Sequence, residues 1–354
     1  MVCIAAFIIL CIIGIFVAFL SIFKRDIGRK YWAVFKKSWG CVGKHVRLQK
    51  CETGFKDDVK NALLGKVVLS HPTWVKPLGM AIEVSAILIV FITIWSLIEA
   101  IKALLAIWVF GTCNVSQPAS CALGAEVCGI DAKEPTNVIE WTGRWFDEWG
   151  QIFTNIPDKF HNWRAEDYVE GETLPLATEI GDFVEGHDLV LEIVDPGCSI
   201  CQQSYRNMLS SGFFEQYNTL MMVYPITLPD GGYKFDNSDV IARYIHACDL
   251  ADTDYAAKIL HRIFAEADQN GLNYQTAFLA ISNNEAGQLI EKWLKEWGAK
   301  DTEIKQIRNH TTSAEVDEIM AKINQIVEDQ IHVKGIPTML KDGDKKSGLY
   351  KAKE

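Results

Sequence analysis

The sequence predicts an α/β domain that follows a hairpin of two transmembrane helices. Three observations support this prediction. Two long apolar stretches lie in the first third of the chain, a strongly basic segment separates them, and a strand–turn–helix pattern near residue 200 carries two cysteines. At 354 residues, the chain is long enough to bury a substantial core in one or two domains.

Residues 1–23 are the first predicted transmembrane helix. They contain no charged side chain and are long enough to cross a bilayer. They differ from a signal peptide because no basic residue precedes the apolar stretch and Lys24-Arg25 follows where a cleavage site would lie. Residues 81–110 are the second predicted span, interrupted by three charged side chains at Glu83, Glu99 and Lys102.

The charge distribution predicts the orientation in the membrane. Residues 24–80 contain 13 Lys or Arg and 4 Asp or Glu, which places this basic loop in the cytoplasm by the positive-inside rule. Residues 111–354 then lie outside, and their 21 basic and 39 acidic side chains offer no surface suited to nucleic acid. We therefore expect a multi-pass protein of the cell membrane, in contact with the lipid bilayer, whose folded part is extracytoplasmic.

Residues 111–169 are predicted to be an extracytoplasmic linker that contains Cys113, Cys121 and Cys128 in a turn-rich segment. Disulfides persist outside the cytoplasm, so we expect a structural disulfide among these three cysteines. The third would remain, either for Cys248 or for relaying electrons to the cysteine pair near residue 200.

The cysteines of the basic loop, Cys41 and Cys51, should be reduced in the cytoplasm. Together with His45 they would make only an incomplete zinc site. We therefore predict no metal and no cofactor for this chain.

An amphipathic helix, interrupted near Pro157, is predicted over residues 137–165. Trp141, Trp145 and Trp149 recur at every fourth position on its apolar side. This stripe could rest on the outer membrane interface, where Trp is favoured, or pack against the domain that follows. Packing in a core is the more common outcome for such a stripe, and we expect it here.

Residues 170–354 are predicted to form the α/β domain, with a helical insertion at about 237–330. Alternating or continuous apolar runs bounded by turn residues predict the strands, and apolar residues at helical spacing predict the helices of the insertion. The expected strands are an edge strand at Leu174–Ile180, central strands at Leu189–Val194 and Leu220–Tyr224, and a closing hairpin of Thr338–Leu340 with Gly348–Tyr350.

The two cysteines of the sequence Cys198-Ser199-Ile200-Cys201 lie where a buried strand passes into the first turn of a helix. The positive end of a helix stabilises a thiolate there, so Cys198 is the expected attacking thiol, partly exposed. Cys201, one turn further and more buried, would resolve the mixed disulfide. Glu192 lies among apolar residues of the strand. A carboxyl group buried there could exchange protons with Cys201, whereas on the solvated face of the strand it would have no such role.

Three separate pieces of the sequence resemble the thioredoxin superfamily, and in particular the DsbA type of extracytoplasmic disulfide oxidoreductase. These are Val190-Leu191-Glu192 six residues before the Cys198-x-x-Cys201 motif, the segment His332–Leu340 about 140 residues later, and the helical stretches Ile241–Cys248 and Ile259–Phe264 between them. The resemblance covers residues 170–345. The dipeptide between the cysteines is Ser-Ile, where strongly oxidising members have Pro-His, and the last helix of the usual fold is expected to be missing or replaced.

The resemblance implies a thioredoxin-like fold with a helical insertion and assigns roles to several residues. Glu192 would be the buried acid that relays protons to the second thiol. Pro337 would be the family's cis-proline beside the dithiol, and Ile336 would contact the bound polypeptide. The expected function is therefore disulfide exchange through Cys198 and Cys201 with cysteine-containing extracytoplasmic proteins. A membrane or soluble redox partner would reset the dithiol.

Two other classes of function remain open from the sequence. In one, the domain only binds polypeptides and its cysteines form a structural disulfide. In the other, Cys198 and Cys201 carry a metal ion, although the chain lacks accompanying Met-rich or His-rich segments. The direction of electron flow is not encoded in any pattern that we recognise.

Overall fold

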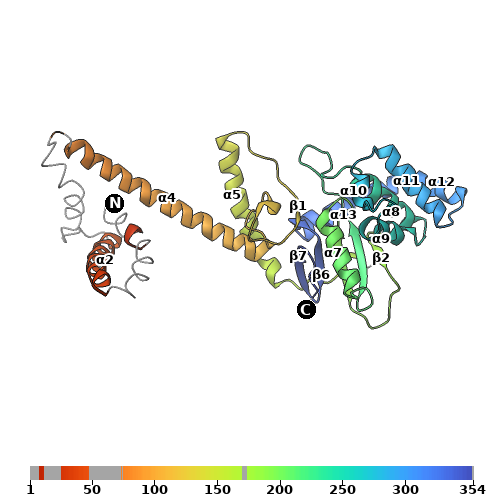
Figure 1. Cartoon of the computed structure of the whole chain (residues 1–354), viewed down its shortest axis with the longest axis horizontal. Helices are drawn as coiled ribbons and strands as arrows, with labels where there is room; N and C mark the ends of the chain where they lie inside the picture. The colour runs from red at the N-terminus through yellow and green to blue at the C-terminus, as the bar shows by residue number, and fades with distance from the viewer. Residues whose placement is uncertain (1–7, 12–24, 48–72, 74, 170–173, 353–354) are drawn as a thin grey trace. The chain divides into compact units, whose positions relative to one another are not determined.

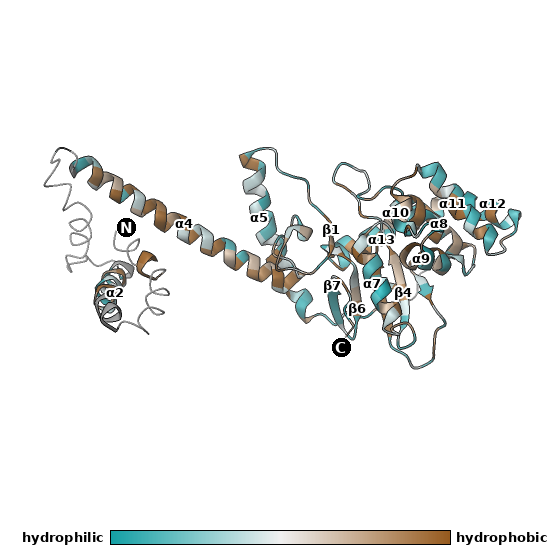
Figure 2. Cartoon of the chain, in the orientation of Figure 1, coloured by the Kyte–Doolittle hydropathy of each residue, from teal (hydrophilic) through white to brown (hydrophobic). Residues whose placement is uncertain are grey.

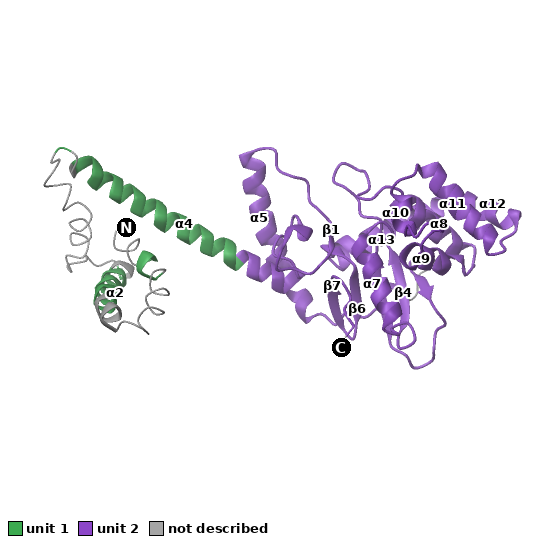
Figure 3. Ribbon diagram, in the orientation of Figure 1, with its two compact units in different colours: residues 1–101 green, residues 102–354 purple. Residues whose placement is uncertain are grey.

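The computed structural model describes residues 8–11, 25–47, 73, 75–169 and 174–352 (Figure 1). It divides into two compact units, residues 1–101 and 102–354 (Figure 3). The predicted first span, residues 1–23, lies outside the described residues except for positions 8–11, which are helical.

The first unit contains helix α2 (Arg25–Val46) and most of helix α4 (Val75–Phe110). Among the described residues, one helical stretch, Lys76–Phe110, is long and apolar enough to cross a membrane. Many of its residues are hydrophobic, as the brown colour along α4 shows (Figure 2), and many of its apolar side chains are exposed in the structure. The described residues thus contain one candidate span, and the predicted two-helix hairpin is not established by them.

Cys41 on α2 differs from the expectation for a cytoplasmic loop. Its side chain is completely buried and it is disulfide-bonded. The prediction that the cysteines of the basic loop are reduced is therefore wrong for Cys41, because a pattern of basic residues carries no information about which sulfur atoms meet on folding. Cys51 lies outside the described residues.

A five-stranded mixed sheet forms the centre of the second unit. Its spatial order is β2-β4-β3-β6-β7, with β3 parallel to β4 and the other neighbouring pairs antiparallel. The strands are β2 (Thr178–Ile180), β3 (Leu189–Val194), β4 (Asn218–Val223), β6 (Thr338–Lys341) and β7 (Asp344–Ser347). Strand β3 is the middle strand, and five of its six residues are buried, which explains its nearly continuous apolar sequence.

The predicted β3 agrees with the structure, whereas the closing hairpin was placed wrongly at its second strand. We expected that strand at Gly348–Tyr350, but β7 begins at Asp344. Asp342 and Gly343 both have positive φ, 55° and 79°, and Lys341 pairs directly with Asp344. A two-residue turn with positive φ at both positions returns the chain at once, so the second strand starts immediately after it.

Helices cover the sheet and form the insertion between β4 and β6. Helix α7 (Ser199–Ser210) follows β3 directly and packs against α9. The insertion consists of α8 (Ser238–Leu250), α9 (Tyr255–Ala265), α10 (Tyr274–Phe278), α11 (Asn283–Glu296), α12 (Asp301–His310), α13 (Ala314–Gln325) and the short helix η4 (Ile326–Gln330). Their buried faces join those of the sheet in one continuous hydrophobic core.

The linker contains several short elements besides one long helix. They are η2 (Pro118–Ser120), β1 (Cys128–Gly129), α5 (Val138–Thr154), η3 (Ile156–Phe160) and α6 (Glu166–Val169). The break that was predicted near Pro157 separates α5 from η3. Helix α5 begins at Asn137, whose side chain accepts a hydrogen bond from the backbone N–H of Glu140.

The tryptophan stripe of α5 does not enter a core, so the expectation of core packing is wrong. Trp141 is 43% exposed, and Trp145 and Trp149 are only half-buried. The helix is held instead by Ile152, which is completely buried in a small cluster with Ala106, Val109, Phe110 and Val115 at the end of α4. An amphipathic pattern shows that a helix has an apolar side but does not identify the surface that covers it.

The edge of the sheet beside β7 is covered by residues that follow α5. The backbone N–H of Trp163 donates a hydrogen bond to Gly343 O at 2.9 Å, and its buried ring lies 4.4 Å from Lys345 Nζ. After β7 the chain continues without a helix to Tyr350, whose ring packs on Phe213 at 5.0 Å. Part of the linker thus covers the edge strand β7, and the residues after β7 pack beside Phe213.

Candidate active site

Cys198 lies at the junction of β3 and α7. After Val194 the chain turns through Asp195-Pro196-Gly197, and Cys198 is the N-cap of α7 with extended backbone angles (φ −78°, ψ 118°). The backbone N–H of Cys201 points at Cys198 Sγ at 3.4 Å. The sulfur therefore faces the N–H groups at the positive end of a helix, the environment that stabilises a thiolate.

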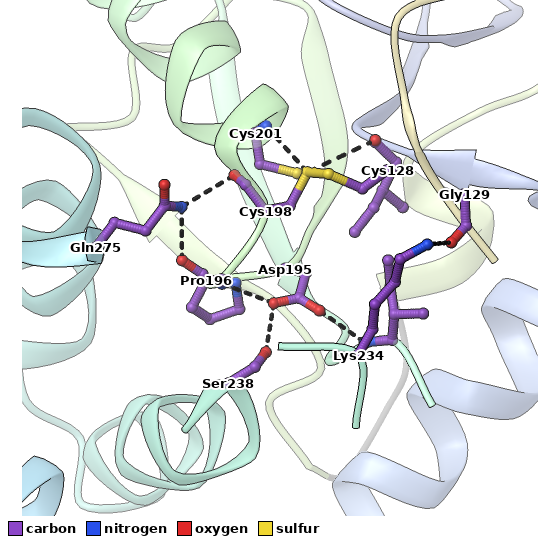
Figure 4. Close-up of a disulfide and its surroundings, with 12 residues drawn as sticks. Cys128, Gly129, Asp195, Pro196, Cys198, Cys201, Lys234, Ser238 and Gln275 are labelled. Atoms are coloured by element: carbon purple, nitrogen blue, oxygen red, sulfur yellow. Dashed lines mark hydrogen bonds between the residues drawn. A yellow bond between two sulfur atoms is a disulfide. The ribbon is translucent and has the colours of Figure 1, made fainter. Parts of the chain in front are cut away.

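A buried carboxylate holds the turn before Cys198. Asp195 accepts hydrogen bonds from the backbone N–H groups of Gly197 and Ile226, both at 2.7 Å, and from the hydroxyl of Ser238. Figure 4 shows it directly beneath the disulfide. Burial raises the pKa of Asp195 to about 6, although these three hydrogen bonds act in the opposite direction. The sequence shows Asp195 only as a turn residue, so this role was missed.

The helical insertion also reaches the turn. Gln275 on α10 is buried, and its Nε2 donates to the carbonyl oxygens of Pro196 at 2.8 Å and Cys198 at 2.9 Å (Figure 4). Both acceptors belong to the backbone that sets the position of the reactive sulfur. No local sequence pattern distinguishes Gln275 from other polar residues of the insertion, so sequence reasoning could not have found it.

The loop before β6 lies against Cys198, as expected. The Ile336–Pro337 peptide bond is cis, and Ile336 belongs to the short strand β5 (Gly335–Ile336). The carbonyl oxygen of Ile336 is 4.0 Å from Cys198 Sγ. The hydroxyl of Thr338 donates a hydrogen bond to Gly335 O at 2.7 Å, which stabilises the conformation of the loop. The structure therefore brings Ile336 and Pro337 next to the cysteine pair.

Cys198 is bonded to Cys128, and this pairing is the main difference from the sequence-based expectation. The Cys128–Cys198 disulfide joins Cα atoms 6.2 Å apart, while Cys201 is a free, completely buried thiol. Cys198 is completely buried as well, so the prediction of a partly exposed sulfur is wrong for this state. The segment around Cys128, which is distant in sequence, covers it. The expected structural disulfide does form between Cys113 and Cys121.

Glu192 is buried beneath the cysteines, which excludes the solvated face of the strand. Its side chain is 1% exposed, and Oε1 accepts a hydrogen bond from the Ser204 hydroxyl at 2.9 Å. Within the described residues, Oε2 has no hydrogen-bond partner. Burial raises the pKa of Glu192 to about 8, so the carboxyl group is mostly protonated near neutral pH.

The Cys201 thiol has a pKa well above its ordinary value. Burial is the largest cause, and the nearby charges of Glu192 and Asp195 raise it further. A thiol in this position is a poor nucleophile until a neighbouring base accepts its proton. Glu192, a buried group with a perturbed pKa on the adjacent strand, is chemically suited to that task.

The sheet order, the Cys-x-x-Cys motif at the start of α7 and the cis-proline loop beside it define a thioredoxin-like domain with a helical insertion. No protein-family model and no curated protein matches the chain. Among solved structures, it is similar to a thioredoxin-like oxidoreductase from Silicibacter pomeroyi (16% identity, TM-score 0.37), covering 53% of this chain and 91% of that one. It is also similar to the thiol–disulfide exchange protein α-DsbA2 from Wolbachia pipientis (13% identity, TM-score 0.37), covering 52% of this chain and 84% of that one. A third similar structure is the thiol–disulfide oxidoreductase MdbA from Corynebacterium matruchotii (16% identity, TM-score 0.34), covering 52% of this chain and 92% of that one.

Replacing Glu192 with Gln tests the buried carboxyl group. In the unfolded chain Glu192 ionises near its ordinary value of 4.5, whereas in the folded chain it stays protonated until about pH 8. Its contribution to stability is therefore complete below about pH 4.5 and is lost as the pH rises through 8. Thermal unfolding of the full-length protein in detergent should show the wild type losing on the order of 5 kcal/mol relative to Glu192→Gln across this range.

The control for this experiment is Glu185→Gln, because Glu185 is exposed in the loop before β3. It should leave the pH dependence of unfolding unchanged. If the wild type and Glu192→Gln show parallel stability from pH 4.5 to 9, Glu192 does not have a raised pKa. The Glu192→Gln protein should also exchange disulfides at least tenfold more slowly at neutral pH, because it lacks the carboxyl group that can exchange a proton with Cys201.

Gly197→Ala tests the packing of the turn. A Cβ added at Gly197 would lie 2.3 Å from the Cβ of Phe235, an atom fixed to the backbone. We expect a loss of about 1–3 kcal/mol in the free energy of unfolding and a displaced Cys198. Gly150→Ala is the matched control, because Gly150 lies in helix α5 with nothing within 4 Å of the added atom. Equal stability of the two variants would contradict the tight contact at Gly197.

Proposed function

We propose that this protein is a thiol–disulfide oxidoreductase, anchored in the cell membrane, that exchanges disulfides with cysteine-containing proteins outside the cytoplasm. One observation carries the proposal. Cys198 lies at the N-terminus of α7 with the backbone of the cis-proline loop 4.0 Å away and a second, buried thiol one helical turn behind it. A structural disulfide requires neither the loop nor the second thiol.

The exchange needs only the two cysteines and a partner of the same chemistry. A substrate thiolate attacks Cys198 of a Cys198–Cys201 disulfide, the Cys198–substrate bond forms, and Cys201 leaves as a thiolate. A second substrate thiolate then attacks its own half of the mixed disulfide and releases Cys198. The substrate has lost two electrons and the dithiol has gained them. A membrane or soluble redox partner with a disulfide resets the pair, and the same steps in reverse reduce a substrate.

The surrounding residues divide the remaining tasks. Glu192 takes the proton of Cys201 when it attacks and returns it when it leaves, because its carboxyl group is buried and has a pKa of about 8. Ile336 and Pro337 present backbone to an extended polypeptide beside Cys198. The buried environment of Cys201 keeps it protonated while Cys198 is bonded to a substrate, which gives the mixed disulfide a finite lifetime.

Helix α4 supports membrane anchoring, and its contacts suggest which part spans the bilayer. Lys102 Nζ pairs with Glu148 Oε2 at 3.0 Å, and both side chains are only 13% exposed. Ala106, Val109 and Phe110 pack with Ile152 of α5. The last two turns of α4 therefore belong to the folded unit, and the span lies before Glu99. Residues 80–98 would extend about 28 Å as a helix, close to the thickness of a hydrocarbon core.

Helix α5 adds a second candidate membrane contact. Ile139, Phe146 and Phe153 lie on one side at spacings of seven residues and are 82%, 67% and 57% exposed. The helix packs against the end of α4, which directly follows the proposed span. An exposed apolar side with aromatic rings at that position is typical of a helix in the outer membrane interface.

The orientation can be tested with two introduced cysteines, Lys36→Cys in α2 and Glu185→Cys in the folded unit, both at exposed positions. A membrane-impermeant maleimide applied to intact cells should label Glu185→Cys. It should label Lys36→Cys only after permeabilisation. Mass spectrometry of the two tryptic peptides separates this labelling from that of native cysteines. Labelling of Lys36→Cys alone in intact cells would invert the proposed orientation.

The catalytic assignment can be tested with reduced full-length protein in detergent and a disulfide-bonded reporter peptide. Cys198→Ala should slow the exchange at least 100-fold, because the remaining Cys201 thiol is buried and has a raised pKa. Cys248→Ala is the matched control. Cys248 is also free and buried, and burial likewise raises its pKa, but it lies on α8 away from the site. A folded wild type without exchange above the uncatalysed rate would contradict the proposal and favour a binding module.

A further inference from the structure

A segment of the linker, residues 125–131, lies across the site and is called the strap here. Within it, β1 pairs antiparallel with β5, so that Cys128 faces Ile336 and Gly129 faces Gly335. The N–H of Ile130 donates to Lys334 O at 2.9 Å, which extends the pairing by one residue. The strap is therefore an extended peptide that forms a backbone ladder with the cis-proline loop and carries a cysteine bonded to Cys198 (Figure 4).

Contacts on both sides hold the strap in place. Lys234 Nζ reaches the carbonyl oxygen of Gly129 at 2.7 Å and the carboxylate of Asp131 at 2.6 Å. On the other side, Leu349 N–H donates to Glu126 O at 3.1 Å. These contacts involve five residues that lie outside the Cys-x-x-Cys motif. They make the strap a fitted part of the site.

The loop opposite the strap is shaped to receive it. A Cβ added at Gly335 would lie 2.7 Å from Val127 Cγ2, and one added at Gly348 would lie 2.6 Å from Ala125 Cβ. Both glycines thus allow the backbone of the strap to approach closely. Gly335 is on the strand that the strap pairs with, so the fit and the ladder concern the same surface.

We propose that the strap occupies the site beside β5 and Cys198 where a substrate polypeptide would bind, and that the Cys128–Cys198 disulfide is a closed resting state that Cys201 opens. This inference rests on the proposed function, since it concerns the regulation of the same cysteine pair. The closed state prevents substrate binding in two ways. The sulfur of Cys198 is already bonded, and the backbone edge of β5 is already paired.

Opening is an intramolecular exchange that needs no outside oxidant or reductant. In molecules in which Glu192 is ionised, Cys201 transfers its proton to the Glu192 carboxylate, and the Cys201 sulfur attacks Cys198 Sγ. The Cys198–Cys201 bond forms and the Cys128–Cys198 bond breaks. Cys128 leaves as a thiolate and takes a proton from water. One disulfide and one thiol are present before and after, so the three cysteines keep their oxidation level. The covalent bond between the strap and Cys198 is gone, and the substrate site can open.

The same geometry makes Cys128 a competitor of the substrate. A substrate that is bonded to Cys198 can be displaced by Cys201 or by Cys128, and the strap holds Cys128 close to that sulfur. A tethered thiol acts at an effective concentration far above that of a thiol free in solution. Cys128 should therefore release trapped substrates even when Cys201 is absent.

The lifetime of a mixed disulfide tests this inference. Reduced full-length protein in detergent is incubated with a peptide whose cysteine forms a disulfide with a small leaving thiol, and intact-protein mass spectrometry follows the Cys198–peptide adduct. The adduct should survive at least tenfold longer in Cys128→Ala/Cys201→Ala than in Cys201→Ala. In the single variant, the adduct should decay to the Cys128–Cys198 disulfide. The double variant Cys201→Ala/Cys248→Ala is the control and should match Cys201→Ala.

Lys234→Met keeps the length of the side chain and removes both of its bonds to the strap. In the Cys201→Ala background it should lengthen the adduct lifetime to between those of the single and the Cys128 double variant. Equal lifetimes with and without Cys128 would overturn the strap inference and leave the proposed function standing. No adduct in any folded variant would overturn the proposed function itself.

The wild type provides a measurement that does not depend on a variant's folding. Acid quenching of the oxidised protein followed by alkylation and peptide mapping should find two isomers. In one, Cys128 is bonded to Cys198 and Cys201 is alkylated. In the other, Cys198 is bonded to Cys201 and Cys128 is alkylated. If Cys198 is found bonded only to Cys201, the closed state is not populated and the inference is wrong.

Discussion

The site depends on the hydrogen bonds that the buried carboxylate of Asp195 accepts. Its three donors come from the turn itself, from the chain just after β4 and from the first residue of α8. One side chain thus ties the end of the central strand to its parallel neighbour and to the insertion. Because Cys198 follows three residues later, any change in these bonds displaces the reactive sulfur. Burial removes water from the carboxylate, and its three hydrogen-bond donors compensate for that cost in free energy.

Two acids with different surroundings lie near Cys201, and this difference gives each a distinct role. Asp195 has three hydrogen-bond donors, and burial raises its pKa only to about 6. Glu192 has one, from Ser204, and its pKa rises to about 8. The better-satisfied acid is therefore the more readily ionised and serves as a fixed structural acceptor. The poorly satisfied acid, Glu192, changes its protonation near neutral pH, as its proposed role as proton carrier requires.

Part of this architecture was predictable because it is encoded locally. Strand β3 was predicted with the same bounds as in the structure, since a buried middle strand requires a continuous apolar run and the turn residues end it. The second strand of the closing hairpin was misplaced because Asp342 adopts positive φ beside Gly343, a detail of turn chemistry rather than of hydrophobic pattern.

The predictions that failed concern features that depend on contacts between distant segments of the chain. The tryptophans of α5 remain largely outside a core because Ile152 is the residue of α5 that enters the buried apolar cluster at the end of α4. The sequence indicated that one of the three linker cysteines would remain, but not that it is Cys128 or that its partner lies 70 residues away, because sequence does not determine such pairings. Gln275 comes from an insertion whose position over the turn only the folded chain defines. The prediction that Cys198 is partly exposed failed for the same reason, because the segment that covers Cys198 comes from the linker.

The separation of 70 residues between Cys128 and Cys198 has a consequence for how the protein acquires its bonds. In an unfolded chain, closing that large loop is less favourable than closing the three-residue loop between Cys198 and Cys201, by about 3 kcal/mol in the chain-entropy treatment. A newly made chain that meets an oxidant before it folds is therefore expected to join Cys198 to Cys201. The bond to Cys128 can be favoured only after the sheet, the loop and Lys234 have assembled around the strap. The Cys128–Cys198 disulfide therefore indicates that the domain has folded, whereas a misfolded chain would keep the Cys198–Cys201 disulfide.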